Sequence, residues 1–189
     1  AGAALALVLV FGWKGWQKHQ DTQAQTASVL YQQLLDVALV PSEQVDAQQV
    51  AKLLAELKKV NQSSAYAQYA GLLAAKVAVD NNQLDDASLE LNAILAKPAN
   101  DTLAELARQR LARVLLAQEK AEQALQLLDV KVAPAFAATR EELRGDALVV
   151  LARPEEAKAA YEQAKQALSS EAAAGNLLMK LDNLSEKDA

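Results

Sequence analysis

Alanine and leucine dominate this sequence to a degree that few folds accommodate. Of the 189 residues, 41 are alanine and 32 are leucine, whereas only 6 are glycine and 4 are proline. Alanine and leucine are strong helix formers, and glycine and proline interrupt helices. Strand-rich folds need more β-branched and aromatic residues and more glycine turns, and this chain has only 2 Trp, 4 Tyr and 2 Phe. The sequence therefore predicts an all-α protein with enough apolar residues to form a core.

The apolar residues beyond residue 20 recur at helical spacing, and short segments interrupt them. All four prolines lie in these interruptions, where a proline in the first turn of a helix is tolerated. Thr102 followed by Glu105 predicts a capping box at one helix start, and Ser170 before Glu171 predicts another start. We expect about nine helices, separated by breaks at 39–42, 61–63, 80–83, 97–101, 118–120, 130–134, 153–154 and 169–170.

Three segments share one arrangement of small and large residues. A small residue is followed, twelve positions later, by an alanine and, four positions after that, by a large residue. The sets are Ala75, Ala87 and Leu91; Ala112, Ala124 and Leu128; and Gly145, Ala157 and Tyr161. Two helices of a hairpin pack closely only where side chains are small, and large residues then fill the space towards the next hairpin. The pattern predicts tetratricopeptide-like helical-hairpin repeats, an α-solenoid.

In repeats of this kind the first helix of each hairpin lines a concave face. Fixed offsets from the small residue predict twelve lining residues: Tyr69, Leu72, Lys76 and Val79; Leu106, Gln109, Arg113 and Leu116; and Thr139, Glu142, Asp146 and Val149. Their mixture of apolar and charged side chains is typical of a groove that binds a peptide or a helix of another protein. Two alternatives stay open. The apolar members belong to the core or lie under the terminal helices, or Arg113 and Asp146 form a structural ion pair.

The N-terminus differs in kind from the rest of the chain. Residues 1–13 are uncharged and apolar, although a bilayer-spanning helix needs roughly 20 such residues. The residues that follow, Trp13, Lys14, Trp16 and Lys18, are of the types that prefer the headgroup layer or reach it. We interpret residues 1–18 as the C-terminal part of a transmembrane anchor helix with an interfacial girdle, and residues 19–189 as the repeat domain. A signal-peptide remnant and a buried core helix are the alternatives.

Few residues of this chain are suited to catalysis. The sequence has no cysteine, a single histidine, His19, and no glycine-rich phosphate loop. Paired acids at Asp85–Asp86 and Glu155–Glu156 open predicted helices, where negative charge is favourable. The net charge is −5 without a basic stripe, which argues against a nucleic-acid partner. We predict a protein without enzymatic activity, without a cofactor and without a metal site.

Five stretches carry a resemblance to a known family: GWKGWQKHQ at 12–20, ASVLYQ at 27–32, RLARV at 110–114, LRGDAL at 143–148 and MKLDNL at 179–184. Together they resemble the YfgM family, the ancillary subunits of the SecYEG translocon in Gram-negative bacteria. The resemblance implies a short cytoplasmic tail, one transmembrane helix in the inner membrane and a repeat domain in the periplasm. It also implies association with the translocon and with the periplasmic chaperone PpiD. Lys14 and Lys18 alone would favour the opposite orientation.

Two functions follow from these observations. The first is a membrane-tethered protein-binding module that assists the translocon and periplasmic chaperones with newly translocated client proteins. The second is a structural scaffold or assembly factor of an envelope complex that does not bind clients. Both use the same repeats, and both contact the lipid bilayer through the N-terminal helix.

Overall fold

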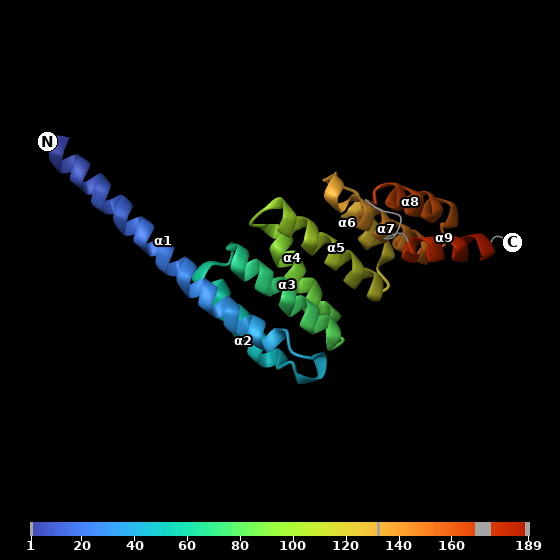
Figure 1. The fold of residues 1–189 in the computed structure, drawn as a ribbon, viewed down its shortest axis with the longest axis horizontal. Helices are drawn as coiled ribbons and strands as arrows, with labels where there is room; N and C mark the ends of the chain where they lie inside the picture. The colour runs from blue at the N-terminus through green and yellow to red at the C-terminus, as the bar shows by residue number, and fades with distance from the viewer. Residues whose placement is uncertain (1, 132, 169–174, 188–189) are drawn as a thin grey trace.

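The computed structural model describes residues 2–131, 133–168 and 175–187, and these residues are almost entirely helical (Figure 1). The helices are α1 (Gly2–Ala38), η1 (Ser42–Gln44), α2 (Ala47–Asn61), α3 (Ala65–Asp80), α4 (Leu84–Ala96), α5 (Asp101–Ala117), α6 (Ala121–Leu128), α7 (Pro134–Val150), α8 (Pro154–Gln166) and α9 (Gly175–Lys187). The described residues contain no strand, and the all-α prediction is confirmed. Seven of the predicted breaks separate consecutive helices, and the break at 169–170 lies outside the described residues.

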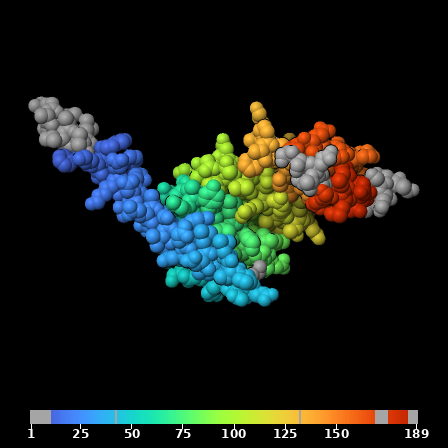
Figure 2. Space-filling model, viewed as in Figure 1, coloured from blue at the N-terminus to red at the C-terminus, as the bar shows by residue number. Residues whose placement is uncertain are grey.

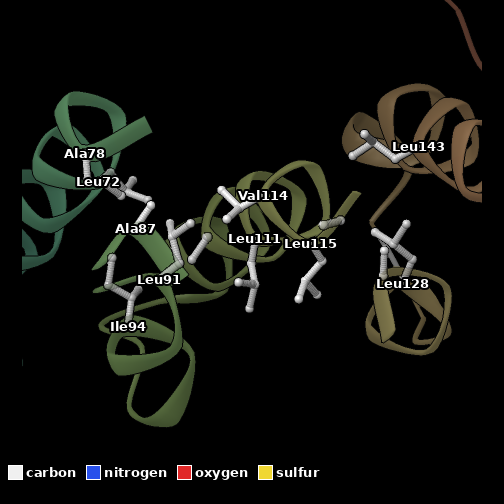
Figure 3. Close-up of a cluster of buried hydrophobic side chains, with 14 of the residues drawn as sticks. Leu72, Ala78, Ala87, Leu91, Ile94, Leu111, Val114, Leu115, Leu128 and Leu143 are labelled. Carbon is white, nitrogen blue, oxygen red and sulfur yellow. The ribbon is translucent and has the colours of Figure 1, made fainter. Parts of the chain in front are cut away.

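Four antiparallel hairpins follow one another along the molecule (Figure 1). The second half of α1 pairs with α2, and α3 with α4, α5 with α6 and α7 with α8 follow, while α9 packs on the last hairpin. The predicted small residues Ala75, Ala112 and Ala157 are all buried. Figure 3 shows Leu111, Val114 and Leu115 of α5 between side chains of α3 and α4 on one side and of α6 and α7 on the other. The core is therefore continuous from one hairpin to the next, as in a solenoid.

The α1 helix extends far beyond the hairpins (Figures 1 and 2). Residues 11–22 of α1 are exposed, and Ala27 is the first residue beyond them that is buried. From Ala27 onward α1 packs in a core cluster with α2 and α3. The helix continues without a break across the predicted boundary between residues 18 and 19. Among the helices described, none combines the length and the hydropathy needed for a membrane span.

The turns inside three hairpins are built in the same way. Asn82, Glu119 and Ala152 follow the first helix of their hairpins, with φ angles of 58°, 60° and 54°. In each turn the next amide donates to the carbonyl five residues back, a Schellman motif that satisfies the end of the first helix. The three hydrogen bonds are Gln83 N to Ala78 O at 2.7 Å, Lys120 N to Leu115 O at 2.8 Å and Arg153 N to Leu148 O at 2.9 Å. The turns thus recur in step with the small residues of the sequence pattern.

Gly145 and Tyr161 explain why the third set differs from the other two. A Cβ atom placed on Gly145 would lie 2.2 Å from a ring carbon of Tyr161, a distance that no pair of carbon atoms tolerates without a shift. In the other two sets the large residue is a leucine, Leu91 or Leu128, which is smaller than tyrosine, and the small residue is an alanine. The tyrosine ring therefore occupies the space that a side chain at position 145 would need.

The predicted capping box at Thr102 is wrong. The N-cap of α5 is Asn100, whose side chain accepts a hydrogen bond of 2.9 Å from the Leu103 amide. The Glu105 carboxylate turns inward and binds Arg140 of α7. Pairing Glu105 with the buried Arg140 stabilises the fold more than a second capping hydrogen bond would, because a buried charge left unpaired costs about 3–5 kcal/mol.

Candidate protein-binding groove

The first helices of the hairpins lie next to one another and form a row, which we call the A-helix row: the second half of α1, then α3, α5 and α7. Two arginines connect neighbours in this row. Arg110 of α5 donates a hydrogen bond of 2.9 Å to the carbonyl oxygen of Leu72 in α3. Arg140 of α7 donates to Glu105 of α5, and also to the carbonyl oxygens of Leu128 at 2.7 Å and Val130 at 2.8 Å. These polar contacts fix the spacing of the row.

The structure divides the twelve predicted lining residues into interior and surface groups. Leu72 is 3% exposed and belongs to the core. Gln109 is 6% exposed and donates a hydrogen bond of 3.0 Å to Glu105. Both are therefore interior residues and do not line an open face. Two more, Leu106 and Leu116, are half-buried against the core.

The remaining predicted residues reach the surface to different degrees. The exposed members are Tyr69, Lys76, Val79, Arg113 and Val149, and the half-buried ones are Thr139, Glu142 and Asp146. Three of the exposed side chains, Lys76, Val79 and Arg113, converge on one pocket. The offsets thus select surface residues of α3 and α5 that line one pocket, but they also select Leu72 and Gln109, which are buried.

This pocket lies between α3, α4 and α5, and we call it the α3–α5 pocket. Its volume is about 320 Å³, and its lining residues are Ala75, Lys76, Val79, Leu84, Leu91, Arg110, Arg113, Val114 and Ala117. The buried members Ala75, Leu91 and Val114 form an apolar floor. Lys76, Arg110 and Arg113 bring positive charge to the same pocket. An apolar floor with a few polar groups is the usual composition of a binding site.

The three cations of the α3–α5 pocket differ in how they are compensated. Lys76 Nζ lies 2.6 Å from the Asp80 carboxylate. Arg110 contacts the Leu72 carbonyl, and burial, together with the nearby charge of Arg113, lowers the pKa of Arg110. Arg113 is exposed and forms no ion pair within the part of the chain that the structure describes. Two guanidinium groups therefore have no carboxylate partner among the described residues.

The α9 helix covers part of the A-helix row at its C-terminal end. Lys180 Nζ lies 2.7 Å from Glu142 Oε1 and 2.6 Å from Asp146 Oδ1. Asp146 also accepts a hydrogen bond of 2.8 Å from the Tyr161 hydroxyl. The predicted alternative of an Arg113–Asp146 ion pair is therefore wrong, because Lys180 and Tyr161 already bind this carboxylate. On α7, Val149 is the predicted lining residue that is most exposed.

The charges around α9 shift two pKa values. Burial raises the pKa of Tyr161, and the hydrogen bond to Asp146 raises it further. For Lys180 burial favours the neutral amine, but the bonds to Asp146 and Glu142 outweigh burial and raise the pKa. Lys180 Nζ also lies 5.5 Å from the centre of the Tyr161 ring. The protonated forms of both side chains therefore stabilise the packing of α9.

The four predicted interfacial residues lie on the projecting part of α1. Trp13, Lys14, Trp16 and Lys18 are all exposed. The rings of Trp13 and Trp16 contact each other, with centroids 5.2 Å apart and planes inclined by 38°. They remain 63% and 54% exposed, because no other described part of the chain covers them. Two exposed tryptophans on one helix face are typical of residues that meet a membrane interface.

Comparison with known proteins gives a family. The sequence model of a tetratricopeptide repeat-like domain matches residues 1–186. A protein of Escherichia coli K12, named "Ancillary SecYEG translocon subunit", is 31% identical over 184 residues, which cover 97% of this chain and 86% of that protein. The chain belongs to this family. Proteins of the same name from Haemophilus influenzae and Neisseria gonorrhoeae are also 31% identical, over 93% and 96% of this chain and 83% and 87% of their own lengths.

Membership of the family of ancillary SecYEG translocon subunits confirms the resemblance inferred from the sequence, and the repeat-like domain confirms the repeats.

The two pairs of acidic residues singled out in the sequence lie at the starts of helices, as predicted. Asp85 and Asp86 lie in the first turn of α4, and Glu155 and Glu156 in that of α8. Within the described residues no three His, Asp or Glu side chains are placed to bind a metal ion.

Sequence reasoning missed several residues that organise the groove. Arg110 precedes Arg113 by three positions, so helical spacing alone would have placed both on one face. Arg140 and Glu105 are 35 positions apart, and no local pattern connects them. Lys180 lies in a helix for which no repeat offset was available. Periodic spacing within a repeat can be recognised in a single sequence. Side-chain contacts between repeats cannot, because they join positions with no fixed separation.

Proposed function

We propose that this chain is a membrane-tethered protein-binding module without catalytic activity that acts beside the SecYEG translocon. The observation that carries the proposal is the α3–α5 pocket, which opens on the surface residues of the A-helix row. The names of the relatives support the translocon as the place of action. The exposed tryptophan pair on α1 supports attachment to a membrane. The family resemblance implies the inner membrane, with the repeat domain in the periplasm, and we adopt that placement as part of the proposal.

In this function the A-helix row binds apolar segments of newly translocated proteins or of the periplasmic chaperone PpiD. Each contact is weak, because the exposed apolar area is small and broken by charges. The tether compensates for this weakness, since it holds the groove near the exit of the translocon and so raises the local concentration of clients. A scaffold that never meets a client would use the same row for one permanent partner.

Copurification from mild detergent tests the attachment. The chain is compared with a variant in which Trp13, Trp16, Lys14 and Lys18 are all replaced by serine, so that the helix and the repeat domain remain complete. We expect translocon components to accompany the original chain and to be depleted with the variant. Recovery of no translocon component with either protein would contradict the proposal.

Site-specific photo-crosslinking separates the two functions. A photoreactive residue is placed at Val79 or Val149 on the A-helix row, and at Leu89 of α4 as a control that is also exposed but lies outside the row. Crosslinks from the row to many nascent chains support the client-binding module. Crosslinks to a single stable protein support the scaffold instead. Equal yields from Leu89 and from the row would mean that the row is not the binding face.

A further inference from the structure

The lining of the α3–α5 pocket carries positive charge without any acidic residue. Its lining includes three cations and no acid. A pocket between α6, α7 and α8 combines Arg144 and Arg153 with Asp129 and Glu156. A pocket between α5, the segment that connects α6 with α7, and the start of α7 balances two acids with two cations. Lys76 is paired with Asp80, so the charges without a described counter-charge are those of Arg110 and Arg113, in a chain whose net charge is −5.

The geometry points to a specific occupant: we propose that the α3–α5 pocket binds a side-chain carboxylate flanked by aliphatic residues, within a segment of a partner protein. This inference rests on the proposed function, because it names the kind of segment that the A-helix row accepts. Guanidinium groups bind carboxylates through paired hydrogen bonds of the charge-assisted kind. The apolar floor formed by Ala75, Leu91 and Val114 receives the aliphatic neighbours.

Within the described residues, the carboxylates of Asp80, Glu142 and Asp146 already have other partners. Asp80 binds Lys76 at 2.6 Å. Asp146 and Glu142 on α7 bind Lys180 at 2.6 and 2.7 Å. The guanidinium groups of Arg110 and Arg113 therefore have no described acid to neutralise them.

Arg110 is also held in position for such a ligand. One of its five N–H donors binds the Leu72 carbonyl at 2.9 Å, which anchors the guanidinium group between α3 and α5. The remaining donors have no hydrogen-bond partner among the described residues. An arginine that is already half-ordered loses less entropy when it binds a carboxylate, so its contribution to affinity is larger. Arg113 is exposed and supplies a second donor group at the same pocket.

The size of the pocket limits what enters it. A volume of about 320 Å³ is at the lower end of small-ligand sites. It admits a few side chains of an extended or helical segment, whereas a whole second helix would have to lie across the row. The pocket therefore determines which side chains are accepted at one position, while the rest of the bound segment contacts the A-helix row less specifically.

A direct test uses three short peptides of alternating leucine and serine that differ only at the central residue, which is Glu, Gln or Lys. Binding to the full chain in detergent micelles is followed by fluorescence anisotropy. We expect the Glu peptide to bind about tenfold more tightly than the Gln peptide, as a hydrogen-bonded charge pair would give. The Lys peptide should bind most weakly, and added salt should reduce the difference.

Matched variants assign the effect to the pocket. Arg113→Gln should remove most of the preference for Glu, and Arg113→Glu should reverse it in favour of the Lys peptide. Lys158→Gln is the control, because Lys158 is exposed on α8 and its replacement changes the net charge equally. Circular dichroism of each variant confirms that the fold is retained. A preference that Lys158→Gln abolishes as fully as Arg113→Gln would assign the effect to net charge and overturn the inference.

The remaining outcomes distinguish this inference from the proposed function. Equal binding of the Glu and Gln peptides would overturn the carboxylate inference and leave a groove for apolar segments. Absence of binding by all three peptides, together with absence of crosslinks from Val79, would overturn both. Vesicles containing phosphatidylglycerol serve as the lipid arm. Arg113-dependent binding to vesicles without a preference among the peptides would assign the pocket to lipid phosphate and overturn the peptide inference.

Discussion

At the scale of single residues, Gly145 and Tyr161 form a sterically coupled pair. Gly145→Ala should lower the free energy of unfolding by about 1–3 kcal/mol, because the new methyl group overlaps the tyrosine ring. The hydrogen bond between the ring hydroxyl and Asp146 keeps the ring from moving aside. Urea unfolding followed by circular dichroism measures the loss.

A double variant checks this explanation. Gly145→Ala with Tyr161→Leu reproduces the combination of Ala112 and Leu128 found one hairpin earlier. We expect a favourable coupling energy within the range of about 0.5–3 kcal/mol for residues in contact. Additive effects of the two substitutions would show that the ring is not what excludes a side chain at position 145.

At Ala152 a single substitution is expected to stabilise the fold. Its φ of 54° places a residue with a Cβ in the left-handed region, where glycine is favoured. Ala152→Gly should therefore raise the free energy of unfolding by about 0.5–1 kcal/mol, despite the greater freedom of glycine in the unfolded chain. Ala159→Gly in the middle of α8 is the matched control and should lower it by about 1 kcal/mol. Thermal denaturation should show a higher melting temperature for Ala152→Gly and a lower one for Ala159→Gly than for the original chain.

At the scale of secondary-structure elements, one buried ion pair connects α5 with α7. Arg140 is 1% exposed and binds both carboxylate oxygens of Glu105. Arg140→Met should lower the free energy of unfolding by about 3–5 kcal/mol, since Glu105 would remain as an unpaired buried charge. Adding Glu105→Gln should recover part of this loss but not all of it. The carbonyl oxygens of Leu128 and Val130 would still lack their donor. Chemical denaturation of the single and double variants measures both steps, and full recovery would contradict the role of Arg140 as a cap of α6.

The attachment of α9 depends on Lys180. Lys180→Met should release α9 from α7, at a cost of about 1–3 kcal/mol for the charged hydrogen bonds to Glu142 and Asp146. Hydrogen exchange of the amides around Leu177 and Leu181 should become faster. Lys158→Met, which removes a lysine with an exposed side chain from α8, should leave these amides unchanged.

The same contact gives a pH dependence with a defined sign. The pKa of Lys180 and the pKa of Tyr161 are both raised in the folded state from ordinary values of 10.5 and 10.0. Groups whose pKa is raised by folding contribute their full stability below the unfolded pKa and lose it as the pH rises. We expect α9 to stay attached at neutral pH and to loosen above about pH 10, with hydrogen exchange or limited proteolysis as the measurement. Loosening on acidification through neutral pH, in the absence of global unfolding, would contradict this assignment.

The helices and turns were predictable from the sequence because they depend on local composition and spacing. The small residues Ala75, Ala112 and Gly145 marked the hairpins, and the break segments marked the turns. The exposure of the predicted lining residues was predictable only in part. The offsets predicted Lys76, Val79 and Arg113, which are exposed and line one pocket, but they could not reveal that Leu72 is covered by its neighbours. Contacts between distant positions, such as Glu105 with Arg140 and Lys180 with Asp146, depend on how the hairpins stack, and one sequence does not record that.

At the scale of the whole molecule, α1 is one continuous helix that carries the exposed tryptophan pair and, further along, packs in the first hairpin. About eleven residues separate Trp16 from Ala27, the first buried residue beyond the exposed stretch; at 1.5 Å per residue they span about 16 Å. A helix without a break transmits rotation as well as distance. The membrane attachment proposed above would therefore fix both the height of the A-helix row and the direction in which it faces.

Insertions of alanine after Gln20 test whether this orientation matters. Each added residue turns the repeat domain by about 100° around the helix axis and lifts it by about 1.5 Å. Two alanines should therefore turn the row away from its partner and reduce crosslinking from Val79. Seven alanines should restore most of the crosslinking, because seven residues complete nearly two turns. A yield that declines steadily with length would indicate that distance alone matters, and a constant yield would show that α1 does not set the orientation. A Gly-Ser insertion of seven residues is the matched control: it adds equal chain length without preserving the helix, so its yield should fall below that of seven alanines.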